Sequence, residues 1–208
     1  MNEADKIVGQ MRPWLAVIFF LSGAAALIYQ IAWQRALFVI YGLDAVSSTI
    51  VVTAFMLGLG LGSLAGGVLS RTYPAATVPL FAGSELGIGL FGFFSLDLFN
   101  VVAGWTVGIG YLATGIAAFL LVVIPTTLMG ATLPLLVAHL STLSGNVGRS
   151  VGTLYFANTL GAAAGAYFAA TVLLRAPGLG GTVQAAAGLN AWLGIVVFGL
   201  AAVERRIA

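Results

Sequence analysis

Long stretches without a charged residue are the feature of this sequence that most limits how it can fold. No Lys, Arg, Asp or Glu lies between Asp97 and Arg149, between Arg149 and Arg175, or between Arg175 and Glu204. At 1.5 Å per residue of helix, each stretch can cross a hydrocarbon core of roughly 30 Å. Since backbone polar groups in lipid must bond within the chain, we expect these crossings to be helices.

The composition agrees with residence in a membrane. Hydrophobic residues make up 61% of the 208 residues, charged residues only 7%, and the mean hydropathy is +1.10. Soluble domains carry about 25% charged residues, so this chain cannot cover a water-facing surface. There is no cysteine, which excludes disulfides, thiolate metal sites and cysteine catalysis. We therefore expect an all-α, polytopic transmembrane helix bundle in the cell inner membrane, with lipid as its main surroundings.

The crossings follow from the apolar runs. We expect a cytoplasmic lead at 1–13, one transmembrane domain at 14–203 and a short tail at 204–208. Pro13 suits a first helical turn. Five crossings are expected at about 14–35, 46–70, 78–97, 151–173 and 182–203.

The stretch from Leu98 to Leu143 allows two interpretations. It is either two crossings divided at Pro125, or an interfacial or re-entrant piece followed by one kinked crossing that ends near His139. Lys and Arg favour cytoplasmic loops. Six crossings leave outside either Arg175 alone or Arg175 with Arg35, whereas seven also move Arg149, Arg205 and Arg206 outside. We therefore expect six crossings, with seven as the alternative, and both termini in the cytoplasm. The residues then cytoplasmic are Lys6, Arg12, Arg71, Arg149, Arg205 and Arg206.

Glycines spaced four apart recur along the expected helices. Small residues at this spacing allow helix backbones to approach closely in a membrane. They indicate either tight static packing or helices that slide on one another. The sets are Gly58, Gly62 and Gly66, then Gly83 and Gly87, then Gly161 and Gly165.

Glu85 is the most informative polar residue, because it lies well inside an expected crossing. Burying a carboxylate at that depth costs roughly 2.5–3.5 kcal/mol. It is either a proton, cation or amine site, or a structural hydrogen-bonded group. Arg35 is the natural candidate partner, since it follows Gln30 and Gln34 near the end of the first crossing. These residues predict either a polar, aromatic-lined cavity or an arginine that reaches the interface.

Two further places could hold polar chemistry. Tyr155, Asn158 and Thr159 form a stripe that indicates interhelical hydrogen bonding, or alternatively the wall of a polar cavity. Pro125 and Pro134 predict a kink, or a broken helix whose freed carbonyls bind a cation or ligand. We expect no catalytic residue, no metal site, no cofactor and no nucleic-acid partner, since no suitable constellation of residues occurs.

Several motifs occur in an order that resembles the membrane region of the spermidine synthase-like membrane proteins. That family joins a major-facilitator-like region to a soluble aminopropyltransferase domain. The resemblance implies half of a major-facilitator fold. The motifs are Ser22–Gln30 with Trp33–Arg35, Ala54–Ser63, Glu85–Leu90, Pro125–Pro134 and Leu154–Ala162.

The sequence departs from the family in two ways. Gln30 stands where members often carry Glu, and the chain ends at Ala208, where the enzyme domain would begin. We therefore expect no enzymatic activity of this chain. The first hypothesis is a transporter-like module for a small polar or cationic solute, with polyamines suggested only by the resemblance. The alternatives are a non-catalytic anchoring subunit of a membrane complex, or a fragment of the fused enzyme. A homodimer, other membrane subunits or a soluble enzyme are the expected partners.

Overall fold

Six long helices form a single bundle in the computed structural model, which describes residues 3–41, 44–106 and 108–207. No strand occurs in these ranges. Two short turns of other helix types interrupt the order, a 3-10 turn before α3 and a π turn after α5. The elements are α1 Glu3–Tyr41, α2 Asp44–Thr72, η1 Pro74–Ala76, α3 Thr77–Thr106, α4 Tyr111–Ser144, α5 Val147–Phe168, η2 Ala169–Leu173 and α6 Gly178–Ile207.

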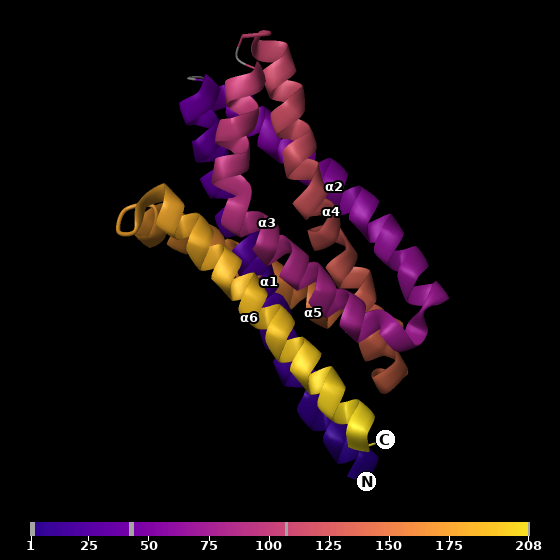
Figure 1. The fold of residues 1–208 in the computed structure, drawn as a ribbon. Helices are drawn as coiled ribbons and strands as arrows, with labels where there is room; N and C mark the ends of the chain where they lie inside the picture. The colour runs from indigo at the N-terminus through magenta and orange to yellow at the C-terminus, as the bar shows by residue number, and fades with distance from the viewer. Residues whose placement is uncertain (1–2, 42–43, 107, 208) are drawn as a thin grey trace.

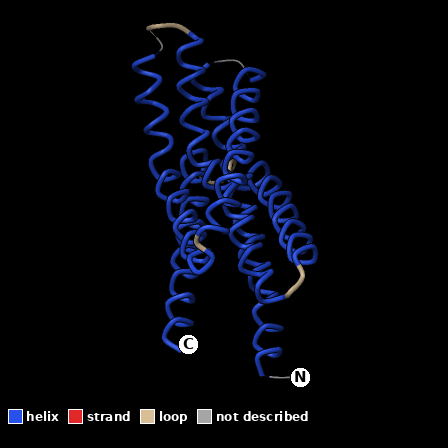
Figure 2. The backbone as a smooth tube through the Cα atoms, turned by 90° about the vertical axis from the view of Figure 1, so that its right-hand side faces the viewer, coloured by secondary structure: helices blue, strands red, loops and turns tan. Residues whose placement is uncertain are grey.

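All six helices are long and apolar enough to cross a membrane, which confirms the predicted all-α bundle and makes the chain a multi-pass membrane protein. The two ends of the chain lie at the same end of the bundle (Figures 1 and 2), as an even number of crossings requires.

Two predicted boundaries differ from the structure. Pro13 lies inside α1 rather than in its first turn, because the helix already begins at Glu3. The segment from Leu98 to Leu143 does not divide at Pro125. Its first part completes α3, a turn with a left-handed-type backbone at Gly110 (φ 129°) follows, and the remainder belongs to the single helix α4.

Helix α4 passes through both prolines because neighbouring groups bond its backbone carbonyls. A proline lacks the N–H that would bond the carbonyl four residues earlier, so Pro134 frees the carbonyl of Gly130. The Ser63 hydroxyl of α2 donates to that carbonyl at 3.2 Å. Near Pro125, which frees the carbonyl of Leu121 instead, the Thr126 hydroxyl donates to the neighbouring Val122 carbonyl at 2.8 Å. The freed backbone thus serves helix packing in this structure.

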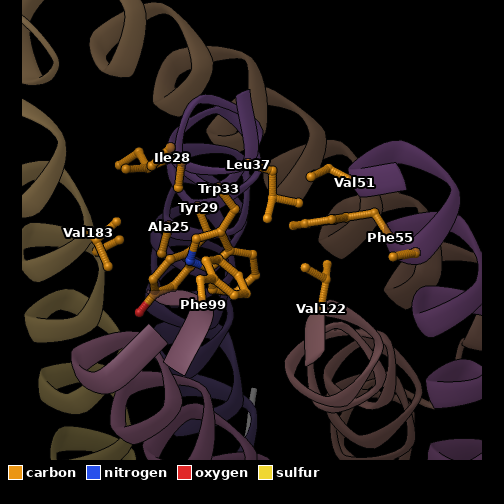
Figure 3. Packing of buried hydrophobic residues seen from close by; sticks show 14 of the residues in the cluster. Ala25, Ile28, Tyr29, Trp33, Leu37, Val51, Phe55, Phe99, Val122 and Val183 are labelled. Carbon is orange, nitrogen blue, oxygen red and sulfur yellow. The ribbon is translucent and has the colours of Figure 1, made fainter. Parts of the chain in front are cut away.

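The core of the bundle surrounds α1. Trp33 and Tyr29 are fully buried and stack with ring centroids 4.7 Å apart. Figure 3 shows them at the centre of the packed side chains, with Phe99 beside them. The Trp33 indole N–H donates to the Ser95 hydroxyl at 3.0 Å. These rings therefore fill the core. The sequence interpretation in which they line a cavity is not what the structure shows.

Close backbone contact joins α2 to α4. A Cβ added at Gly62 would overlap the Thr127 carbonyl oxygen, and one added at Gly66 would overlap the backbone of Ala131. A Cβ at Gly58 would overlap the side chain of α4's Thr126. The predicted glycine face is thus a tightly packed helix contact.

The same contact recurs between α5 and α1. A Cβ at Gly161 would overlap the Phe20 carbonyl oxygen, and one at Gly165 would overlap the Ala24 carbonyl oxygen. The remaining expected set, Gly83 and Gly87 of α3, does not make such a contact. Gly83 has open space where a Cβ would be, and Gly87 faces only the Leu128 side chain at 3.0 Å.

These two contacts are equivalent, position by position. Thr127 of α4 corresponds to Phe20 of α1, and Ala131 corresponds to Ala24. The number of residues between the two members is the same in both pairs. The match extends to the reciprocal contacts. A Cβ at Gly130 of α4 would overlap the backbone of α2, and one at Gly23 of α1 would overlap the backbone of α5. Helix α1 therefore packs against α5 in the same way as α4 packs against α2. In this correspondence α1 is equivalent to α4, and α2 is equivalent to α5.

The contact between α3 and α6 has the same symmetry within itself. A Cβ at Gly89 would lie 3.0 Å from the Ala187 carbonyl oxygen, and one at Gly194 would lie 3.0 Å from the Ala82 carbonyl oxygen. The most extensive helix contacts in the bundle are α2 with α4, α1 with α5 and α3 with α6. Exchanging the first three helices with the last three leaves this set of pairs unchanged. The bundle thus consists of two three-helix repeats of inverted topology, related by a pseudo-two-fold axis.

Candidate functional site

Glu85 lies at the junction of three helices and is fully buried. The Ser22 hydroxyl of α1 donates to its Oε1 at 2.6 Å, and the Asn190 amide of α6 donates to its Oε2 at 2.5 Å. One carboxyl group thus receives a hydrogen bond from each of two other helices. A group satisfied in this way can remain in a membrane despite the cost of burial.

The Glu85–Asn190 bond crosses the pseudo-two-fold axis. The separation that relates Ala82 to Ala187 and Gly89 to Gly194 also relates Glu85 to Asn190. The two residues therefore occupy equivalent positions in the two repeats and bond directly to each other. In transporters built from inverted repeats, solute and coupling-ion sites lie where the repeats meet, near the bilayer midplane.

Two buried polar atoms, one in α6 and one in α1, have no hydrogen-bond partner in the structure. They are the Asn190 Oδ1 and the Tyr29 hydroxyl oxygen, both buried. The Tyr29 hydroxyl lies against Gly92 of α3, about two helical turns from Glu85. Most buried polar atoms in proteins have partners. This site therefore holds spare hydrogen-bonding capacity.

The expected pair between Glu85 and Arg35 is not formed. Arg35 is exposed, whereas Glu85 is fully buried. Ser22 and Arg35 lie roughly 20 Å apart along α1 at the rise of a regular helix, so the bond from Ser22 places Glu85 far from the arginine. Among the described residues, hydroxyl and amide donors take the place of the expected cation.

The other expected site residues are separated from Glu85. The Asn158 amide donates to the Phe19 carbonyl of α1 at 3.2 Å, which is the interhelical bond that the sequence favoured. Tyr155 is 61% exposed on the outer face of α5. The Gln34 amide donates to the Ser48 hydroxyl of α2, and Gln30 is half-buried. The six predicted residues therefore do not form one site.

A second polar place lies at the end of the bundle opposite the termini. A cavity of about 660 Å³ is bounded by α1, the π turn and the residues that follow it. Three of its side chains are polar: Gln34, Arg35 and Arg175. Two predicted residues, Gln34 and Arg35, thus share a cavity with Arg175 of the turn after η2 rather than with Glu85.

Sequence reasoning missed Ser22 and Asn190, and it considered Tyr29 only as an aromatic wall of a cavity near Arg35. Asn190 could have been found by the rule that singled out Glu85, because an amide in the middle of an apolar span also needs a partner. The internal repeat could have placed it opposite Glu85. No group of three or more His, Cys, Asp or Glu residues suited to a metal ion occurs in the described part of the chain.

Comparisons with known proteins give no relative: no protein-family model, no curated protein and no solved structure matches this chain.

Proposed function

We propose that this chain is a transporter-like membrane module, half of a major-facilitator-type fold, that exchanges a proton at Glu85 as it moves a small polar or cationic solute. The observation that carries the proposal is the hydrogen bond between Glu85 and Asn190 across the axis of the two repeats. An ionisable residue inside a membrane bundle is by default a candidate functional group.

The surroundings of Glu85 can serve both of its protonation states. An ionised carboxylate accepts the bonds from Ser22 and Asn190 as they stand. A protonated carboxyl needs an acceptor, and the free Asn190 Oδ1 supplies one after rotation of the amide. A rotation of one side chain would therefore accompany proton binding, with no new partner required.

Half of a major-facilitator fold lacks the second half that completes its solute pathway. We propose a second copy of the chain as that half, in the inner membrane, with both termini cytoplasmic as the positive-inside rule favours. The ordered motifs that resemble the spermidine synthase-like membrane proteins support this assignment, and they suggest an amine as the solute. We propose no catalytic role for the chain.

An anchoring subunit is the second candidate function. The packing of the bundle favours it. Helix α2 contacts the backbone of α4, and α5 contacts the backbone of α1, and such close contacts are typical of a rigid structural bundle. Mild purification followed by identification of co-purifying proteins distinguishes the two. A stoichiometric soluble or membrane partner supports the anchor.

Transport is tested with purified protein in vesicles, radiolabelled spermidine as the probe and an imposed proton gradient. Wild-type protein should take up spermidine faster with the gradient than without it. Glu85→Gln should lose at least about a hundredfold of the gradient-dependent rate, the low end of general acid–base effects. Ser84→Ala is the matched control, because the neighbouring Ser84 is also buried but bonds only its own helix.

Glu85→Gln should still fold, since the reoriented Asn190 amide can accept from the new glutamine. Equal gradient-dependent uptake by Glu85→Gln and wild type would remove the proton role. Uptake by wild type no faster than by empty vesicles would remove amine transport and favour the anchoring subunit.

A further inference from the structure

The cavity opposite the termini has a composition of its own. Its wall combines two arginines and one glutamine with apolar side chains, and no carboxylate lines it. Its volume of about 660 Å³ is within the usual range for ligand sites. The lining residues are Ile31, Gln34, Arg35, Phe38, Ala170, Leu174 and Arg175.

Two positive charges that line one cavity repel each other, and a bound anion would relieve this repulsion. Arg35 comes from α1 and Arg175 from the segment after the π turn, so residues far apart in sequence supply the two charges. Guanidinium groups present planar pairs of N–H donors, which match the oxygens of a phosphate group. The chemistry of the wall therefore selects an oxyanion rather than an amine.

The local backbone shapes this cavity. The π turn Ala169–Leu173 follows α5 directly, and the Leu174 N–H donates to the Ala169 carbonyl at 3.0 Å, a bond across five residues. Such a turn adds a residue to the helix, and π turns occur often at functional sites. Here it comes immediately before Leu174 and Arg175, which both line the cavity. On the other wall, the bond from Gln34 to Ser48 holds the glutamine in place.

The apolar part of the wall indicates what the anion is attached to. Ile31, Phe38 and Leu174 line the same space as the arginines. A ligand that contacts both must be amphipathic, with an oxyanion next to hydrocarbon. A phospholipid in the leaflet at this end of the bundle has this chemistry, and basic pockets between membrane helices on the cytoplasmic side hold anionic headgroups in the same way.

The proposed orientation adds an independent argument. With both termini cytoplasmic, Arg35 and Arg175 lie at the outer end, where arginines are disfavoured. A ligand bound by both arginines would explain why they lie together at the end of the bundle where arginines are disfavoured.

We propose that this cavity binds the phosphate group of an anionic phospholipid through Arg35 and Arg175. Free inorganic phosphate shares the oxyanion chemistry and is the other source that the test must separate. The site is distinct from Glu85, so its occupancy does not depend on the transport proposal.

The test uses purified full-length protein, native mass spectrometry and added phosphatidylglycerol or phosphatidylcholine. Wild type should retain phosphatidylglycerol in preference to phosphatidylcholine. Arg35→Gln and Arg175→Gln should each weaken retention about fivefold, the contribution of one basic residue near an anionic lipid. Arg71→Gln is the matched control, an exposed arginine in the last turn of α2 that lies outside the cavity. Arg35→Lys keeps the charge and should retain more lipid than Arg35→Gln.

A second arm titrates lipid-free protein with inorganic phosphate. Lipid retention that phosphate does not displace supports the phospholipid. Phosphate binding that the same two variants weaken, without a preference between lipids, supports the oxyanion site with a soluble source. Equal lipid and phosphate binding by wild type and both variants, or an equal loss in Arg71→Gln, would overturn the proposal. Circular dichroism of each variant checks that the helices form.

Discussion

At the scale of single residues, one carboxyl group and its donors organise the centre of the bundle. Its depth in an apolar run made Glu85 recognisable from sequence alone, because a charge there needs compensation. Its partners were not recognisable in the same way. Ser22 and Asn190 are neutral, and each lies on a helix remote in sequence. Arg35, near the end of the first crossing, was the predicted partner, but the geometry of α1 places it far from Glu85.

The Tyr29 hydroxyl offers a test of how this centre is satisfied. Because it has no partner in the structure, Tyr29→Phe should leave the free energy of unfolding unchanged or raise it slightly. Ser95→Ala should instead lower it by about 1 kcal/mol, since it leaves the buried Trp33 indole N–H without an acceptor. Thermal unfolding in detergent measures both.

An equal loss of stability in Tyr29→Phe and Ser95→Ala would contradict this expectation, because it would show that the tyrosine hydroxyl has a hydrogen-bond partner in the folded protein.

At the scale of helices, small residues decide which neighbours touch. The spacing of Gly62 and Gly66 predicted a close contact face, and the structure confirms one. The sequence could not assign the partner helix, because a small residue permits close approach without selecting what approaches. It also could not separate Gly83, which faces open space, from the packed glycines. Likewise, the sequence could not show which group bonds the carbonyl freed by Pro134, because the donor, Ser63, belongs to another helix.

Gly62→Ala should destabilise the bundle, by about 1–3 kcal/mol, the usual cost of overpacking. The added methyl group would meet the backbone of α4, which cannot rotate away as a side chain can. Gly60→Ala is the matched control, two residues away on the same helix, because a Cβ there has nothing within 4 Å. Melting temperatures in detergent compare the two variants.

The equivalent change on the second repeat is Gly161→Ala. Gly152→Ala on the same helix is its control, because a Cβ there also has open space around it. The repeat predicts that Gly161→Ala costs about as much as Gly62→Ala. Melting temperatures of Gly62→Ala and Gly60→Ala that coincide would refute the close contact of α2 with α4.

At the scale of the whole molecule, two inverted repeats of three helices explain both the pairing of helices and the position of Glu85. Composition and charge-free runs predicted six or seven crossings, because length and polarity limit what can span lipid, and the positions of Lys and Arg favoured six. They could not show the repeat, which is carried by the matching contacts of a few small residues. An internal comparison of the segments around Gly23 and Gly130 would have been the available signal.

The fold places the α2–α3 turn and the α3–α4 turn at opposite ends of the bundle. The chain has no native cysteine, so single cysteines can report on each side. Tyr73→Cys and Ile109→Cys replace exposed residues at the two turns. A membrane-impermeant thiol reagent added to intact cells should label Ile109→Cys and should label Tyr73→Cys only after the cells are opened. Labelling of both from the same side would contradict the arrangement of the crossings, and the reverse pattern would contradict the proposed orientation.

The central claim is that Glu85, on the axis between the repeats, exchanges a proton. Infrared difference spectroscopy during a pH titration tests it without knowledge of the solute, because a protonated carboxyl has its own C=O stretching band. The account predicts a carboxylic acid band that changes with pH in wild-type protein and is missing from Glu85→Gln. Identical difference spectra from the two proteins would contradict it.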